Sequence, residues 1–227
     1  MRHLFRILIV LSVPVVLTMA MVRLLTFPWY PTYEYARPGF PADPFGLPLR
    51  ERLQLAQASI HFLNIPGRTP ILEELRLPDG EPAYNDRELE HMDDVKAVFT
   101  GLTLFAAVVA AASAAAWIAL VRTLDHCAVW GALLHGGELT LAVLLGLAAW
   151  MLLGFDQFFT FFHGLFFQPG TWVFSYSDTL IRLFPLPFWQ DAGLIVAGGV
   201  SLFSVVLVGV GTRQQRRCHQ KAQESRP

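Results

Sequence analysis

The chain has 227 residues and a net charge of −1; 54% of its residues are hydrophobic and only 15% are charged. A soluble domain carries about 25% charged residues, so the composition excludes an ordinary soluble protein, while the net charge indicates no particular partner. The apolar residues are grouped into runs, and a run of about 18 or more with few charges is typical of a transmembrane helix.

Four runs of this kind predict an all-α polytopic membrane protein with one integral membrane domain over residues 1–227. The expected spans cover residues 4–26, 97–121, 133–154 and 192–211. The first run is longer than the roughly 7–15 residues of a signal-peptide core, so we interpret it as an uncleaved first span. Between the spans we expect an extracytoplasmic helical cap and a re-entrant or interfacial segment.

The distribution of basic residues predicts the topology. Lys and Arg occur in the amino-terminal tail, in the connection between the second and third spans, and in the tail 212–227: Arg2, Arg6, Arg122, Arg213, Arg216, Arg217, Lys221 and Arg226. Cytoplasmic segments near membrane ends are enriched in these residues, so we expect both termini in the cytoplasm. The segments 27–96 and 155–191 then lie outside, and the former holds 12 acidic against 7 basic residues. Cys127 and Cys218 fall on the cytoplasmic side, where no structural disulfide is expected.

The outer segment after the first span begins with aromatic residues at 27–35, a composition typical of a membrane interface. Five Pro and Gly residues within 38–46 exclude a continuous helix there. Pro48 suits a first helical turn, and apolar residues then follow at helical spacing until Pro66-Gly67, which predicts an amphipathic helix.

The next predicted helix carries the first candidate for chemistry. Asn85 and Glu88 have the spacing of a capping box, so a helix is expected to begin at Asp86 and run without a break into the second span. His91 lies on the face that packs within the bundle, and Asp94, three residues on, reaches the same region. Imidazole titrates near neutral pH and suits general acid–base catalysis or metal binding.

The second candidate lies in 155–167, which is almost wholly apolar but too short to cross a membrane, and which we interpret as re-entrant or interfacial. Within it, His163 is the only ionisable residue between Asp156 and Asp178 other than Tyr176. A polar group at bilayer depth is costly unless it is partnered or functional. The plain alternative is an imidazole at headgroup level that bonds water or lipid.

Other polar and aromatic residues of the outer segments are secondary candidates. Arg182 either pairs with Asp178 or meets a lipid phosphate or a substrate carbonyl group, and the aromatic belts include Tyr35 and Trp172. We expect substrate contacts from these four residues. His61 is interpreted as a polar-face residue of its helix, and His135 as a residue paired with Glu138. No ligand role is expected for the other cytoplasmic histidines, His3, His126 and His219.

Several short motifs, taken together, resemble one family of small bacterial four-span membrane proteins. They are Phe40–Gly46 followed by Glu51-Arg52-Leu53, Asn85–Glu88, His91–Lys96, Phe162-His163 with Phe166-Phe167, Trp172–Phe174, Asp178–Ile181 and Phe184-Pro185. This family is that of the lipoprotein intramolecular transacylases. The separation of 72 residues between the two histidines also fits it.

The resemblance implies an acyltransferase of the bacterial cytoplasmic membrane, with its active site at the extracytoplasmic face. The sn-2 acyl chain of a diacylglyceryl lipoprotein would move to the amine of the lipoprotein's own N-terminal cysteine and leave the lyso form. His91 and His163 are then the catalytic pair. We assign His91 as the base toward the amine, oriented by Asp94, and His163 as the donor on the ester side; the reverse order stays open. No cofactor, resident metal or nucleic acid is expected, and the oligomeric state is left open.

Two other classes of function are compatible with the residues. A metal-dependent lipid hydrolase would use His91, Asp94, His163 and Asp178 as ligands. A non-catalytic lipid-binding or assembly protein would explain the aromatic belts without any use for the histidines. A transporter is disfavoured because no interrupted span with buried charge is visible.

Overall fold

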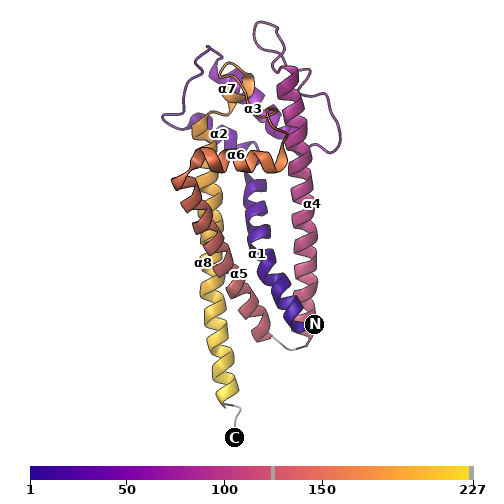
Figure 1. The fold of residues 1–227 in the computed structure, drawn as a ribbon, viewed down its shortest axis with the longest axis vertical. Coiled ribbons are helices and arrows are strands. Elements are labelled where there is room, and N and C mark those ends of the chain that lie inside the picture. Colours follow the sequence, from indigo (N-terminus) through magenta and orange to yellow (C-terminus); the bar gives the residue numbers. More distant parts are fainter. Residues whose placement is uncertain (124–125, 225–227) are drawn as a thin grey trace. The chain divides into compact units, whose positions relative to one another are not determined.

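The structure, a computed structural model, describes residues 1–123 and 126–224, and these are helical apart from loops and one isolated bridge between Arg76 and Pro82. The helices in this part of the chain are α1 (Arg2–Leu25), α2 (Trp29–Ala36), α3 (Leu49–Asn64), α4 (Asp86–Arg122), α5 (His126–Leu153), α6 (Phe155–Phe166), α7 (Thr179–Leu183) and α8 (Leu186–Glu224) (Figure 1). As predicted, four of them, α1, α4, α5 and α8, are long and apolar enough to cross a membrane. The chain divides into two compact units.

The first unit contains most of these four long helices, over Met1–Met21, Thr103–Phe155 and Ile195–Pro227. Its helices approach closely at small residues, as helices in membranes commonly do. A Cβ atom at Gly136 would lie 2.5 Å from a methyl carbon of Val13, and one at Gly137 would lie 2.9 Å from the backbone oxygen of Ser204. Close packing of α5 against α1 and α8 therefore depends on this glycine pair.

The expectation about the cysteines is wrong. A disulfide joins Cys127, at the start of α5, to Cys218, near the end of α8, with their Cα atoms 6.1 Å apart. The argument from cellular compartment left out that α5 and α8 are neighbours, which brings together two residues 91 positions apart. Of the basic residues counted in the tail 212–227, Arg226 lies outside the described residues.

The second unit comprises Val22–Leu102 and Asp156–Leu194 and has its own hydrophobic core. That core is formed by Leu47, Leu55, Phe62, Leu72, Ala83, Tyr84, Met92, Leu180 and Leu183. The amphipathic helix predicted after Pro48 is α3, and the stretch 38–46 is non-helical as expected. Residues from α3, α4 and α7 thus share one core, which fixes the polar start of α4 within this unit.

The start of α4 is held by the predicted capping box. The Asn85 backbone N–H donates to the Glu88 carboxylate at 2.9 Å, and the Glu88 N–H donates to the Asn85 side-chain oxygen at 3.0 Å. The second oxygen of Glu88 accepts the backbone N–H of Leu180 at 2.7 Å. One buried carboxylate therefore caps α4 and attaches it to α7.

The segment predicted to be re-entrant or interfacial is the helix α6, which runs crosswise to α4 (Figure 1). None of its residues is fully buried, and most of its phenylalanines are exposed. An exposed aromatic surface of this kind suits a lipid environment.

Candidate active site

His91 projects from the second turn of α4 into an aromatic cluster. Its ring centroid lies 5.1 Å from that of Phe167 and 5.1 Å from that of Phe174, both in the chain that follows α6. The side chain is half-buried, and its Nδ1 atom is buried with no hydrogen-bond partner among the described residues. His91 thus presents an unsatisfied ring nitrogen inside an apolar enclosure.

His163, on α6, contacts the same phenylalanine ring. Its centroid lies 5.9 Å from Phe167, so one aromatic side chain contacts both histidines. The Nδ1 atom of His163 is 2.8 Å from the backbone oxygen of Phe159, one helical turn earlier. Because a carbonyl oxygen only accepts hydrogen bonds, Nδ1 carries the proton, and neutral His163 is left with an unprotonated Nε2.

Burial favours the neutral form of both imidazoles. The two residues lie outside the four apolar runs that span the membrane. Burial lowers the pKa of His91, the positive charge that His163 would carry lowers it further, and the Asp94 carboxylate raises it by less. Burial also lowers the pKa of His163, more than its hydrogen bond to Phe159 raises it. The two rings are therefore electrostatically coupled and are suited to accept protons.

Trp172 completes the aromatic enclosure around His163. The indole packs on the imidazole with centroids 4.8 Å apart and meets Phe159 edge-on at 5.7 Å. Trp172 was expected from the sequence to contact substrate, and the structure brings it to the catalytic candidate.

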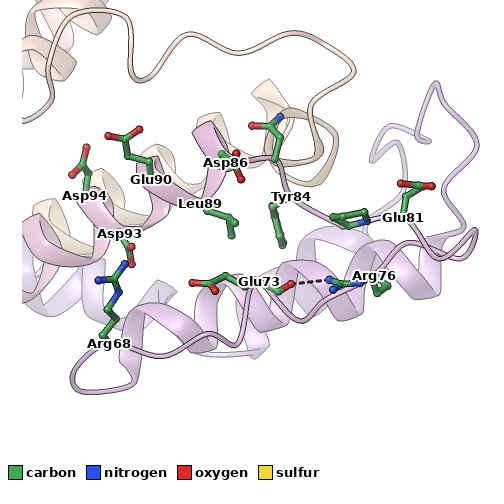
Figure 2. Close-up of a pocket in the computed structure, with 12 residues that line it drawn as sticks. Arg68, Glu73, Arg76, Glu81, Tyr84, Asp86, Leu89, Glu90, Asp93 and Asp94 are labelled. Carbon is green, nitrogen blue, oxygen red and sulfur yellow. Dashed lines mark hydrogen bonds between the residues drawn. The ribbon is translucent and has the colours of Figure 1, made fainter.

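Asp94 lies beside a different feature, a polar cleft of about 870 Å³ (Figure 2). The cleft is lined by Arg68, Glu73, Arg76, Glu81, Pro82, Tyr84, Asn85, Asp86, Leu89, Glu90, Asp93 and Asp94, and neither catalytic candidate is among these residues. Figure 2 shows Asp93 and Arg68 pointing toward each other across it. The effect of Asp94 on His91 is thus electrostatic, through its charge.

Arg182 and Tyr35 have partners within the fold of the second unit. The Arg182 guanidinium donates two hydrogen bonds, each 3.0 Å long, to the two carboxylate oxygens of buried Asp43. The Tyr35 hydroxyl is buried and donates to the backbone oxygen of Leu183 at 2.7 Å. Both side chains stabilise the region around α7, and within the described residues neither forms a hydrogen bond or an ion pair with the histidines.

Asp178 is likewise held by its neighbours. Its carboxylate accepts hydrogen bonds from Arg87 at 2.9 Å and from the backbone N–H of Ser175 at 2.8 Å. Within residues 1–123 and 126–224, no three His, Cys, Asp or Glu side chains converge as metal ligands. The metal-dependent hydrolase therefore has no ligand set among the residues it was expected to use.

Comparison with known proteins identifies the family. Residues 5–189 match the family described as lipoprotein intramolecular transacylase Lit. A protein of Aquifex aeolicus, described as uncharacterised, is 32% identical over 214 residues, which cover 93% of this chain and 94% of that one. The chain belongs to the lipoprotein intramolecular transacylase family.

Solved transacylase structures have the same fold. The membrane-integral enzyme of Bacillus cereus aligns with a TM-score of 0.71 at 18% identity, over 99% of each chain. A variant of that enzyme with one histidine replaced by arginine aligns with a TM-score of 0.67, also at 18% identity, over 100% of this chain and 95% of that one. At this identity the likeness concerns the fold.

The transacylase is thus an acyltransferase of the membrane, and its substrates are lipoproteins. The family moves the sn-2 acyl chain of a diacylglyceryl lipoprotein to the amine of the N-terminal cysteine, which yields the lyso form. Both reacting groups belong to one substrate, so the enzyme must bring them together and control protons at two atoms.

Two features of this candidate site were not predicted from the sequence, namely the shared ring of Phe167 and the carbonyl partner of His163. The hydrogen bond between His163 and the Phe159 backbone oxygen could have been predicted, because Phe159 precedes His163 by four residues in a segment of helical length. Phe167 lies beyond the end of α6, and helix periodicity gave no means of choosing it among the neighbouring phenylalanines.

Proposed function

We propose that His163 is the proton acceptor and His91 the hydrogen-bond donor in this acyl transfer. This is the reverse of the order first assigned from the sequence. One observation carries the proposal: the 2.8 Å bond from His163 Nδ1 to the Phe159 backbone oxygen, which leaves Nε2 free as a base. The Nδ1 of His91 has no comparable partner among the described residues, so its proton can reside on either nitrogen.

The chemistry follows from these two roles. The cysteine α-ammonium, with a pKa of about 8, loses a proton to His163, and the free amine attacks the ester carbonyl carbon. His91 donates an N–H to the carbonyl oxygen as it gains negative charge. When the bond from the acyl carbon to the glyceryl oxygen breaks, His163 returns a proton to that oxygen, and the second amine proton passes to water.

The proposal includes the position of the reaction in the cell. The chain is one integral membrane domain of the bacterial cytoplasmic membrane, both termini are cytoplasmic, and the histidines act at the outer face. This topology is supported by the basic residues of the tails and by the excess of acidic over basic residues in segment 27–96. Diacylglyceryl lipoproteins present their modified cysteine at that face, so enzyme and substrate meet there.

The test is the structure of a lipoprotein N-terminus made in cells with each variant. We expect His91→Ala and His163→Ala each to abolish the N-acyl lyso form, since losing an acid or base costs about 10²–10⁴ in rate. The transfer leaves the mass unchanged, so tandem mass spectrometry must locate the acyl chain on nitrogen. His61→Ala is the matched control because His61 is exposed on α3.

The controls separate loss of chemistry from loss of protein. Each variant must reach the membrane in the same amount and elute as folded protein in detergent. Near wild-type conversion by both histidine variants would contradict the proposal.

A further inference from the structure

The indole nitrogen of Trp172 is an unsatisfied donor beside the base. Its Nε1 atom is buried and has no hydrogen-bond partner among the described residues. Two other tryptophans of the second unit differ in this respect: Trp29 donates to the Leu24 oxygen at 2.8 Å, and Trp189 donates to the Phe184 oxygen at 3.0 Å. The lack of a partner at Trp172 therefore calls for its own explanation.

Burying an N–H without a partner is costly. The donor loses its bond to water and gains none in the protein, so a fold without a use for it would gain by replacing it with an apolar ring. The neighbourhood already supplies such rings, since Phe159 and Phe167 line the same enclosure around His163. An indole rather than a phenyl ring at position 172 thus indicates that the N–H itself has a function.

The location of the donor matches the place where charge develops. Trp172 packs 4.8 Å from His163, centroid to centroid, and its indole is a donor only. Attack of the amine on the ester leaves a negative charge on the carbonyl oxygen, and a preorganised donor in an apolar site stabilises that charge strongly. The helix that carries His163, α6, has no fully buried residue.

We propose that Trp172 donates its indole N–H to the carbonyl oxygen of the transferred acyl group in the tetrahedral intermediate. Trp172 and His91 together then supply two donors to one oxygen. No bond to Trp172 forms or breaks, and its proton stays on the nitrogen throughout. The inference rests on the proposed roles of the two histidines and adds a third catalytic residue to them.

The decisive variant removes the N–H and keeps the shape. Incorporation of 3-benzothienylalanine at position 172 replaces the N–H group by sulfur in a ring of nearly the same size. With a diacylated lipopeptide in detergent micelles, we expect kcat to fall by about 10²–10³-fold while KM changes little, as for removal of one oxyanion donor. Trp172→Phe should show the same kcat defect.

The melting temperature is an independent readout. Because the N–H has no partner in the free enzyme, its removal in the benzothienyl variant should leave the melting temperature unchanged or slightly raised. Trp189→Phe is the matched control: it loses an N–H that already has a partner, in a ring that packs on Phe184 and Phe188, and its kcat should stay at the wild-type value.

Several results would overturn the inference. A benzothienyl enzyme with wild-type kcat would show that the N–H does not act in catalysis. A rise in KM with unchanged kcat would mean that Trp172 only binds the ground state. If His91→Ala and His163→Ala are inactive while the benzothienyl enzyme is fully active, only the role of Trp172 is wrong; active histidine variants would instead overturn the proposed function.

Discussion

In the proposed function, neutral imidazole is the working form of His91 and His163, and burial in the aromatic enclosure favours that form. Burial is the largest influence on the pKa of each ring and lowers it in both cases. A protonated His163 cannot accept a proton from the substrate amine, and a positive charge on one ring disfavours protonation of the other. Because of the apolar surroundings, both imidazoles stay neutral to lower pH than free imidazole does.

This effect predicts the acid limb of the pH–rate profile. A free imidazole has a pKa of about 6.5, and both rings here have lower values, so they stay neutral to lower pH than a free imidazole. We expect kcat/KM for a diacylated lipopeptide to fall with decreasing pH, with a midpoint below 6.5. A midpoint at or above 6.5 would show that burial does not control the catalytic protonation state.

At the scale of elements, the position of His91 depends on how α4 begins. Glu88 caps α4 through Asn85 and accepts the N–H of Leu180 in α7, and it is almost fully buried. Glu88 lies three positions before His91 on the same helix. A change at Glu88 should therefore destabilise the start of α4, on which His91 lies, without changing the groups proposed to react.

We expect Glu88→Ala to lower the free energy of unfolding by about 1–3 kcal/mol, because the buried N–H of Leu180 and the partly buried N–H of Asn85 lose their acceptor. Glu88→Gln keeps one acceptor oxygen and should lose less. Glu90→Ala, on the exposed face of the same turn, is the control and should be nearly neutral. Thermal melts in detergent provide the comparison, and equal melting temperatures for all three variants would contradict the assigned anchoring role.

The sequence predicted the features that depend on residues close together in the chain, and it did not predict those that depend on distant residues. The spans follow from runs of apolar residues, and the start of α4 follows from the capping box at Asn85 and Glu88. The bidentate pairing of Arg182 with Asp43 joins residues 139 positions apart, and no local pattern indicates it. The Cys127–Cys218 disulfide was missed for the same reason, because it depends on which long helices are neighbours.

At the scale of the whole molecule, labelling of the two cysteines can test the proposed membrane topology. The chain has only two cysteines, Cys127 and Cys218, and both belong to segments assigned to the cytoplasm. After reduction, we expect a membrane-impermeant maleimide to label both in inverted vesicles and neither in intact cells. Labelling in intact cells would reverse the topology and move the histidines to the other face.

In the proposed function, His91 and His163 carry out the transfer within one substrate molecule. The most direct measurement uses purified enzyme in lipid bilayers and two diacylated lipopeptides that differ in peptide sequence, one of which carries an isotopically heavy sn-2 acyl chain. Tandem mass spectrometry then identifies which acyl chain is on which amine. We predict that the wild-type enzyme gives N-acyl products without exchange between the peptides, and that His91→Ala and His163→Ala give essentially none. Exchanged products, or histidine variants that work at near wild-type rate, would contradict the account.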